Sequence, residues 1–296
     1  MRLDDLDPSE NVRDLGSGGS GGGFGGGGNI LMGLLPMLLG GRMGCGTLAL
    51  LGIGAAIFFA VGGGGMLSTG SAPTGSGGQV AQGKACDTPE ELQACRVMTS
   101  TEQTWGTLFT AQGQQYPAPT LNFYSGGVQS GCGSATSAAG PFYCPSDRGV
   151  YLDTSFFQEL ASRFGAAGDF AQHYVIAHEV GHHIQNVSGT MERVRREQQR
   201  MSQAEGNALS VRVELQADCY AGVWAARNKD RLEAGDIEEG MRAANAIGDD
   251  TLQKQAQGTI VPESFTHGTS AQRQKWLRRG LETGDPASCD TFSGAI

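Results

Sequence analysis

The residues most able to do chemistry lie in the run His178-Glu179-Val180-Gly181-His182. Histidines four positions apart lie on one face of an α-helix, one turn from each other, so both imidazoles can bind the same ion. Such a pair is typical of zinc sites, and a glutamate beside the first histidine can accept a proton from water at the metal. The motif therefore predicts a zinc-dependent peptidase with Glu179 as its general base.

The sequence around the motif favours a buried helix. Gly168 and Asp169 supply a helix start, and Tyr174 to Ala177 form an apolar approach to the first histidine. Ser188 and Gly189 supply an ending signal soon after the second. The alternative is an ordinary surface helix with solvated charges, and the helical context favours the catalytic interpretation.

A catalytic zinc needs a third protein ligand and one open position. Glu214 is the best candidate, because it lies in a second helical pattern, from about 207 to 228, that can pack beside the first helix. Asp218 follows one turn later and can accept a hydrogen bond from the far nitrogen of a ligand histidine. Two solvated carboxylates are the alternative. The predicted metal ligands are His178, His182 and Glu214.

A further catalytic role is predicted outside these two helices. Peptide hydrolysis creates an oxyanion, which a zinc peptidase commonly stabilises with a His, Tyr or Arg donor. His267, in a loop just before a helix, is the predicted donor, and Arg273 is the alternative. A histidine at a helix entry can equally bond to backbone alone, so both interpretations of His267 stay open.

These motifs together resemble the gluzincin arrangement, in which a His-Glu-x-x-His helix is followed by Glu-x-x-x-Asp. More narrowly, the chain is similar to a bacterial membrane-anchored family of neutral zinc metallopeptidases, from about residue 86 onward and in the layout of its N-terminal anchor. The similarity rests on residues 132–133, 140–145, 150–153, 178–185, 214–222, 246–250 and 266–268. It implies a zincin-like fold and Zn²⁺ held by His178, His182 and Glu214, with Glu179 as base.

Two other functions are compatible with the same residues. A non-catalytic zinc-binding scaffold or assembly factor is one, although a structural site needs no base and would usually close with four protein ligands. A zinc amidase acting on cell-wall peptides is the other, with the same metal chemistry. The predicted function is that of a zinc endopeptidase acting on a peptide or protein, and nothing in the sequence indicates its cleavage preference or oligomeric state.

The composition bounds the partners and the N-terminal region. The chain has 48 glycines, and residues 16–28 are almost entirely Gly and Ser. Such a segment cannot bury a core, so we expect residues 1–29 to form a disordered, acidic and glycine-rich cytoplasmic tail. With 30 acidic against 21 basic residues, the chain is not expected to bind nucleic acid.

An apolar stretch predicts a membrane anchor. Residues 44–61 carry no charge, and the run is close to the roughly 20 residues that span a bilayer. We predict one transmembrane helix at 44–66, an interfacial segment at 30–43 and a linker at 67–85. Arg42 precedes the span and Lys84 is the next cation, which favours a cytoplasmic N-terminus. The expected location is the bacterial inner membrane, single-pass, with a periplasmic or extracellular catalytic domain.

The cysteines support an oxidising compartment. Six of the seven follow the predicted membrane helix, an even number that suits disulfides. Spacing suggests Cys86–Cys95 and Cys132–Cys144, which leaves Cys219–Cys289, although six cysteines permit 15 pairings. A hairpin of both apolar runs would return the domain to the cytoplasm, and the cysteines argue against that arrangement.

The folded part is expected to be one α+β domain over residues 86–296. It should be mostly helical with a small sheet beside the active-site helix, preceded by one transmembrane helix. Helices are predicted near 89–98 and 101–112, a strand at 120–124, a hairpin over 141–153 and a helix to about 164. An extended peptide substrate could add to this sheet as a further strand.

Overall fold

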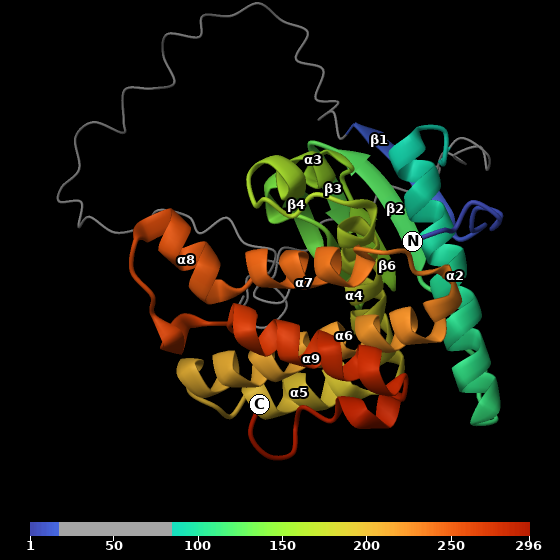
Figure 1. Ribbon diagram of the computed structural model, residues 1–296. Coiled ribbons are helices and arrows are strands. Elements are labelled where there is room, and N and C mark those ends of the chain that lie inside the picture. The colour runs from blue at the N-terminus through green and yellow to red at the C-terminus, as the bar shows by residue number, and fades with distance from the viewer. Residues whose placement is uncertain (18–84) are drawn as a thin grey trace, which may run out of the picture.

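The computed structural model describes residues 1–17 and 85–296. In the labels of Figure 1, its α-helices are α2 (Pro89–Ala111), α3 (Ser155–Ser162), α4 (Asp169–Val187), α5 (Thr190–Gln198), α6 (Gln203–Arg227), α7 (Asp236–Ala246), α8 (Asp249–Gln257) and α9 (Ser270–Thr283). Its strands are β1 (Val12–Ser17), β2 (Thr120–Ser125), β3 (Gly127–Ser130), β4 (Gly133–Thr136), β5 (Phe142–Cys144) and β6 (Gly149–Leu152). Short 3-10 helices cover Ser137–Ala139, Lys229–Arg231, Pro262–Ser264 and Pro286–Cys289.

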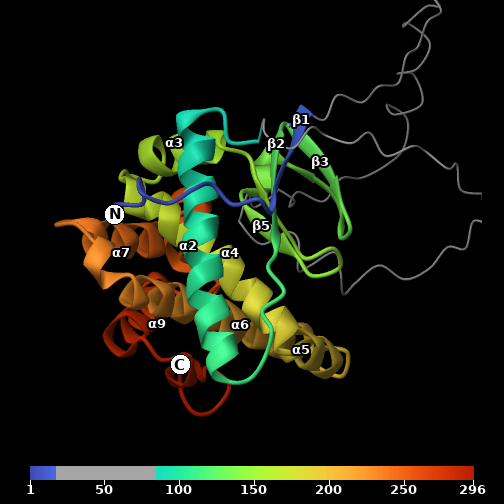
Figure 2. The ribbon, with the colours of Figure 1, turned by 90° about the vertical axis from the view of Figure 1, so that its right-hand side faces the viewer.

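The described residues form a mostly helical α+β fold with a small sheet. The sheet has the order β1-β2-β6-β5, in which β1, β2 and β6 are parallel and β5 runs antiparallel to β6. A separate two-stranded sheet pairs β3 with β4. Most helices gather on one side of the sheet (Figure 2). The predicted strand at 120–124 and the predicted hairpin over 141–153 are both confirmed.

The membrane predictions lie almost wholly outside the described residues. The segments 30–43 and 44–66, and all but the last residue of 67–85, are not part of the described chain. Among residues 1–17 and 85–296, no helix combines the length and the apolar character that a bilayer crossing requires.

The prediction of disorder is wrong for residues 1–17, which fold onto the domain. Met1 and Leu3 are each 4% exposed within the main hydrophobic core. Residues 12–17 form β1, paired with β2 in the sheet. Composition suggested disorder because glycines dominate the neighbouring stretch. In the structure, however, Met1 and Leu3 are buried in the core, and the backbone of residues 12–17 pairs with the edge of β2.

The first long helix also differs from the prediction, because α2 is continuous where two helices were expected. No proline or glycine stands at 98–101, the expected break. The hydroxyl of Thr101 donates to the carbonyl of Met98 at 2.7 Å, and that of Thr99 donates to the carbonyl of Asp7 at 2.7 Å. The hydroxyl of Ser100 donates to Asn228 Oδ1 at 3.2 Å. Because these hydroxyls have partners on the preceding turn or on neighbouring segments, they do not compete for the backbone hydrogen bonds of the helix.

Glycines let the central helices approach closely. A Cβ placed on Gly181 of α4 would lie 2.9 Å from the carbonyl oxygen of Ala217 on α6. Gly222 of α6 and Gly280 of α9 likewise face each other's helix backbone with no room for a side chain. The helix that carries the histidine motif is therefore packed almost backbone to backbone against the helix that carries Glu214.

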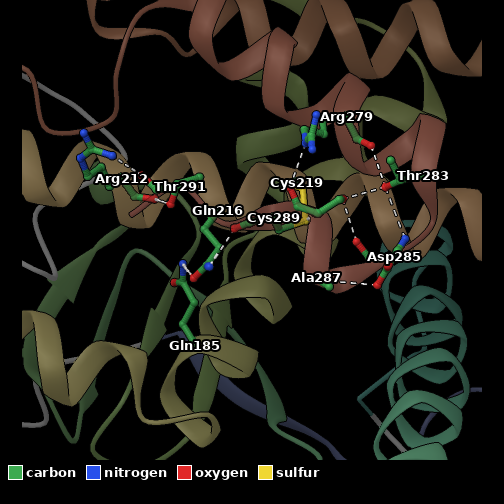
Figure 3. Close-up of a disulfide and its surroundings, with 11 residues drawn as sticks. Gln185, Arg212, Gln216, Cys219, Arg279, Thr283, Asp285, Ala287, Cys289 and Thr291 are labelled. Atoms are coloured by element: carbon green, nitrogen blue, oxygen red, sulfur yellow. Dashed lines mark hydrogen bonds between the residues drawn. A yellow bond between two sulfur atoms is a disulfide. The ribbon is translucent and has the colours of Figure 1, made fainter. Parts of the chain in front are cut away.

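Three disulfides staple the domain, and all three predicted pairs are confirmed. Cys86 bonds Cys95 beside α2, and Cys132 bonds Cys144 at β5. Cys219 of α6 bonds Cys289, in the 3-10 helix that follows α9 (Figure 3). This last bridge closes 70 residues and fixes the C-terminal segment to the Glu214 helix.

Candidate metal centre

The three predicted metal ligands lie together in the buried interface of α4 and α6. Glu214 Oε2 lies 3.2 Å from His178 Nε2, and Glu214 Oε1 lies 3.4 Å from His182 Nε2. One donor atom from each residue falls within 4.8 Å of the other two. All three side chains are almost fully buried. The four-residue spacing on α4 supplies the two imidazoles, and the close approach at Gly181 brings the carboxylate to them.

In both ligand histidines, Nδ1, the ring nitrogen that faces away from Glu214, is hydrogen-bonded to an acceptor on the protein. His178 Nδ1 lies 2.8 Å from Asp218 Oδ1, so it carries the proton that the carboxylate accepts. His182 Nδ1 lies 2.9 Å from Gln185 Oε1. Both rings are thereby fixed with Nε2 turned toward Glu214, which is the orientation that a shared cation needs.

The support behind His178 is a buried charged network. Asp218 is wholly buried and accepts hydrogen bonds from Tyr174 Oη at 2.6 Å and from Arg273 Nε and Nη2 at 2.8 Å each. Burial favours the neutral acid, but the Arg273 guanidinium and His178 outweigh it and lower the pKa of Asp218 to about 2. Asp218 is thus held as a carboxylate. Tyr174 was seen in the sequence only as an apolar helix residue.

The support behind His182 is a chain of neutral amides. Gln185 Nε2 donates to the carbonyl of Val213 at 2.7 Å and to Gln216 Oε1 at 3.1 Å. Gln216 Nε2 in turn donates at 2.9 Å to the carbonyl of Cys289, the residue bridged to α6 (Figure 3). Sequence reasoning missed this chain, although the i, i+3 spacing of His182 and Gln185 on one helix was a signal for its first link.

The electrostatics favour a cation between these groups. Burial opposes the imidazolium of His178, yet the charge of Asp218 and hydrogen bonds to Asp218 and Glu214 raise its pKa to about 9. Burial likewise opposes the Glu214 carboxylate, but His182 and His178 hold the pKa of Glu214 well below its usual value. In the metal-free protein, His178 therefore carries a proton at neutral pH, and this proton supplies the positive charge that a bound metal ion would otherwise supply.

Glu179 lies beside this cluster with a very different environment. It is 3% exposed, and burial raises the pKa of its carboxyl, against the opposing influence of the neighbouring histidines. Its position next to His178 on α4 follows from the motif. A buried carboxyl with a raised pKa is suited to accept and return a proton near neutral pH.

His267 is held beside Glu214 by Asp249. Its Nδ1 lies 3.0 Å from Asp249 Oδ1, and Asp249 Oδ2 accepts the backbone N–H groups of Thr266, His267 and Gly268 at 2.7–3.1 Å. Burial opposes the charged ring, but Asp249 and the charge of Glu214 raise the pKa of His267. One carboxylate at the start of α8 therefore orients both the loop and the ring. No role for Asp249 was predicted.

Arg273 lies behind the cluster rather than in front of it. The side chain is 1% exposed, with two donors on Asp218 and a third, Nη1, 3.3 Å from the carbonyl of Ile247. Its guanidinium is therefore engaged in the network that supports His178. Two residues were considered as the oxyanion donor, His267 and Arg273. Asp249 accepts from Nδ1 of His267, which leaves Nε2 of that ring for an oxyanion, so His267 is the better candidate.

The donor set fits a zinc ion. Two imidazole Nε2 atoms and a carboxylate, with each Nδ1 occupied, are the protein ligands of a three-ligand zinc site. A second carboxylate group, Asp169, Asp236 and Glu239, is also brought together. There the Met1 amino group donates to Asp169 at 2.9 Å and to Asp236 at 3.0 Å, so an internal cation already pairs with it.

An α+β domain with a buried His₂Glu group that could hold a metal, and with a glutamate beside it, has the residues that a metallopeptidase site requires. The chain belongs to the family described as "Putative neutral zinc metallopeptidase", whose model matches residues 1–292.

The chain is also similar to bacterial proteins. The chain is 52% identical over 214 residues to "Uncharacterized protein YpfJ" of Escherichia coli K12, covering 70% of this chain and 75% of that protein. It is 46% identical over 217 residues to "Uncharacterized protein Rv2575" of Mycobacterium tuberculosis H37Rv, covering 68% and 71%. No solved structure matches this chain.

Proposed function

We propose that this protein is a zinc-dependent peptidase with a zincin-like active site. The observation that carries the proposal is the convergence of His178 Nε2, His182 Nε2 and the Glu214 carboxylate beside a buried Glu179. Three protein ligands leave a coordination position for water and substrate, which a structural site does not need. Membership of the metallopeptidase family points the same way.

Zinc bound by His178, His182 and Glu214 would supply a Lewis acid that lowers the pKa of water and polarises the peptide carbonyl. Glu179 accepts the proton of the attacking water and passes it to the leaving amine, the role its raised pKa suits. His267, oriented by Asp249, donates from Nε2 to the oxyanion that develops on the carbonyl oxygen. Asp218 and Gln185 keep the two ligand imidazoles in the binding tautomer.

The substrate proposed is a peptide or protein chain in extended form. β5 is the edge strand of the sheet and contacts α4, where Tyr143 Oη lies 3.0 Å from His183 Nδ1. A substrate strand added to β5 would run beside the metal helix, with main-chain hydrogen bonds providing affinity. A peptide-bound structure without such hydrogen bonds would refute this binding mode.

The first test is zinc content of the full-length chain and its Glu214→Ala variant. We expect about one zinc per wild-type chain and a sharp loss in the variant, because two imidazoles alone hold zinc weakly. Glu238→Ala, at an exposed position of α7, is the matched control and should keep its zinc. Equal zinc in Glu214→Ala and wild type would exclude the proposed ligand set.

The second test separates catalysis from scaffolding. Glu179→Gln should keep zinc and lose turnover of a quenched fluorescent peptide library, because the amide cannot accept the water's proton. Turnover retained in this variant would refute the mechanism. Zinc binding with no turnover in the wild-type protein would favour a non-catalytic zinc scaffold, and cleavage only of cell-wall peptides would favour the amidase alternative.

A further inference from the structure

The N-terminal segment, residues 1–17, is built into the same fold as the metal centre. The backbone of β1 pairs in parallel with β2, aligning Val12 with Leu121 and Asp14 with Phe123. The amide of Leu121 also donates to the carbonyl of Asn11 at 2.9 Å. Figure 2 shows this segment crossing α2 and entering the sheet beside β2. β2 is therefore an interior strand only because residues 12–17 cover its edge.

Apolar anchors fix the beginning of the segment. Leu3 is 4% exposed and belongs to the core cluster that includes residues of α4 and α6. Between Leu3 and β1, Leu6 packs partly buried against the same core. The Arg2 amide donates to the carbonyl of Arg231 at 2.9 Å, which ties this stretch to the chain after α6. Exposing such apolar anchors to water would cost stability, so the segment is not a loosely attached tail.

Polar contacts continue along the segment and match its charge. Asp4 pairs with Arg96 of α2 at 3.1 Å, and Asp5 pairs with Arg231. Ser9 Oγ and Asn11 Nδ2 both donate to Glu102 of α2, at 2.7 and 2.9 Å. These exposed pairs add little energy individually, but they fix the register of the segment on α2.

This packing constrains how the chain between residues 17 and 85 can meet a membrane. A single crossing, as predicted from residues 44–66, would put residues 1–17 and residues 85–296 on opposite sides of the bilayer. β1 could not then pair with β2 within one molecule. We propose that residues 1–17 fold with the domain on the same side of any membrane that the intervening chain enters, so a single crossing does not separate them.

The disulfides indicate which side this is. Three pairs, Cys86–Cys95, Cys132–Cys144 and Cys219–Cys289, form within the domain, and disulfides persist in oxidising compartments. The shared side is then outside the cytoplasm, and the N-terminal segment lies there too, in place of the cytoplasmic tail expected from the charges flanking the apolar stretch. The family model also covers the N-terminal segment, because its match begins at residue 1.

Sidedness is tested by adding one cysteine at a time to the full-length chain, in which Cys45 is replaced by serine and the other six cysteines are kept as disulfides. Glu10→Cys and Gln115→Cys place a thiol at exposed positions of the N-terminal segment and of the loop after α2. Intact cells are treated with a membrane-impermeant maleimide, then lysed and treated again. We expect both variants to be labelled before lysis. Labelling of Gln115→Cys before lysis and of Glu10→Cys only afterwards would overturn the proposal. Labelling of both only after lysis would support the shared side and reject the oxidising compartment.

Docking itself is tested by stability. Leu3→Asp places a charge in the core and should lower the Tm clearly, with Leu3→Ala as the milder variant if Leu3→Asp yields no folded protein. Leu15→Asp is the matched control, because Leu15 lies in the same segment but is 40% exposed. Equal Tm values for both leucine-to-aspartate variants and the wild type would show that the segment is not docked and would also overturn the proposal.

Discussion

The two imidazoles of the metal centre are held by different kinds of chemistry. Behind His178 stands a buried carboxylate, Asp218, itself paired with Arg273. Behind His182 stands the neutral amide of Gln185, linked through Gln216 to the C-terminal segment. The first support sets both the orientation and the basicity of its ligand, whereas the second sets orientation alone. One site therefore combines an electrostatically tuned ligand with a purely positioned one.

The difference also separates two parts of the fold. The charged support, formed by Tyr174, Asp218 and Arg273, lies where α4, α6 and α9 pack together. Its loss should therefore destabilise the core of the domain. The amide support ends at Cys289, which α6 holds through a covalent bridge. Damage behind His178 should therefore lower folding stability strongly as well as zinc affinity, whereas damage behind His182 should act mainly on zinc affinity, with a smaller loss of stability.

The largest expected effect comes from breaking the charged support. Asp218→Asn removes the partner of a guanidinium that is 1% exposed, and breaking a buried ion pair on one side costs about 3–5 kcal/mol of unfolding free energy. Urea denaturation of the metal-free protein measures it. Gln185→Leu is the matched change behind His182, and lost hydrogen bonds there should cost about 1–3 kcal/mol. Equal losses of unfolding free energy in Asp218→Asn and Gln185→Leu would show that the two supports do not differ in their contribution to stability.

Removing the covalent anchor of the amide support should have the next largest effect. The double variant Cys219→Ser/Cys289→Ser should lose about 2–4 kcal/mol, because a bridge across 70 residues constrains the unfolded chain. It should also weaken zinc binding while leaving the pKa of His178, followed by NMR, near its wild-type value. The pair Cys132→Ser/Cys144→Ser is the control and should leave zinc affinity unchanged. A shifted His178 pKa in the first double variant would show that the two supports are coupled.

Zinc affinity compares the supports directly. Asp218→Asn and Gln185→Leu should each weaken zinc binding by about 10–100-fold, because both disturb a ligand's hydrogen-bonded partner. Competition with a zinc chelator measures the two constants. The loss should be greater for Asp218→Asn, since only that change also lowers the basicity of the ligand. A greater loss for Gln185→Leu would mean that orientation, not basicity, dominates affinity.

The smallest expected effect is the pH dependence of zinc affinity and of stability, which arises from the raised pKa of His178. Without metal, the pKa of His178 is raised from 6.5 to about 9, so zinc must displace a proton below that pH. Zinc affinity should rise with pH up to about 9, with proton release detected by calorimetry in buffers of different ionisation enthalpy. Because the folded pKa is the higher one, the metal-free protein gains stability from this proton below pH 6.5. It loses that gain as pH rises through 9. Asp218→Asn should reduce the stability gain and move the rise in zinc affinity to lower pH, because the carboxylate that raises the pKa of His178 most is then gone.

Much of the centre was accessible from the sequence because it is encoded by spacing within helices. His178 and His182 share a face of α4, and Glu214 and Asp218 share a face of α6, both through the i, i+4 periodicity. Two of the three disulfides were predicted from the short spacing of their cysteines, and the third was predicted because only Cys219 and Cys289 remained. The hairpin of β5 and β6 followed from two extended runs around a turn.

Only the tertiary structure decided what lies behind and around these residues. Gln216 and the Cys289 carbonyl reach His182 through contacts between residues far apart in the chain, and Asp249 reaches His267 across a loop. The N-terminal segment was misjudged for the same reason, since β1 and Leu3 are stable only on a partner supplied by residues far along the chain. Periodicity determines which residues share a face, but the partner of that face depends on packing that no local pattern contains.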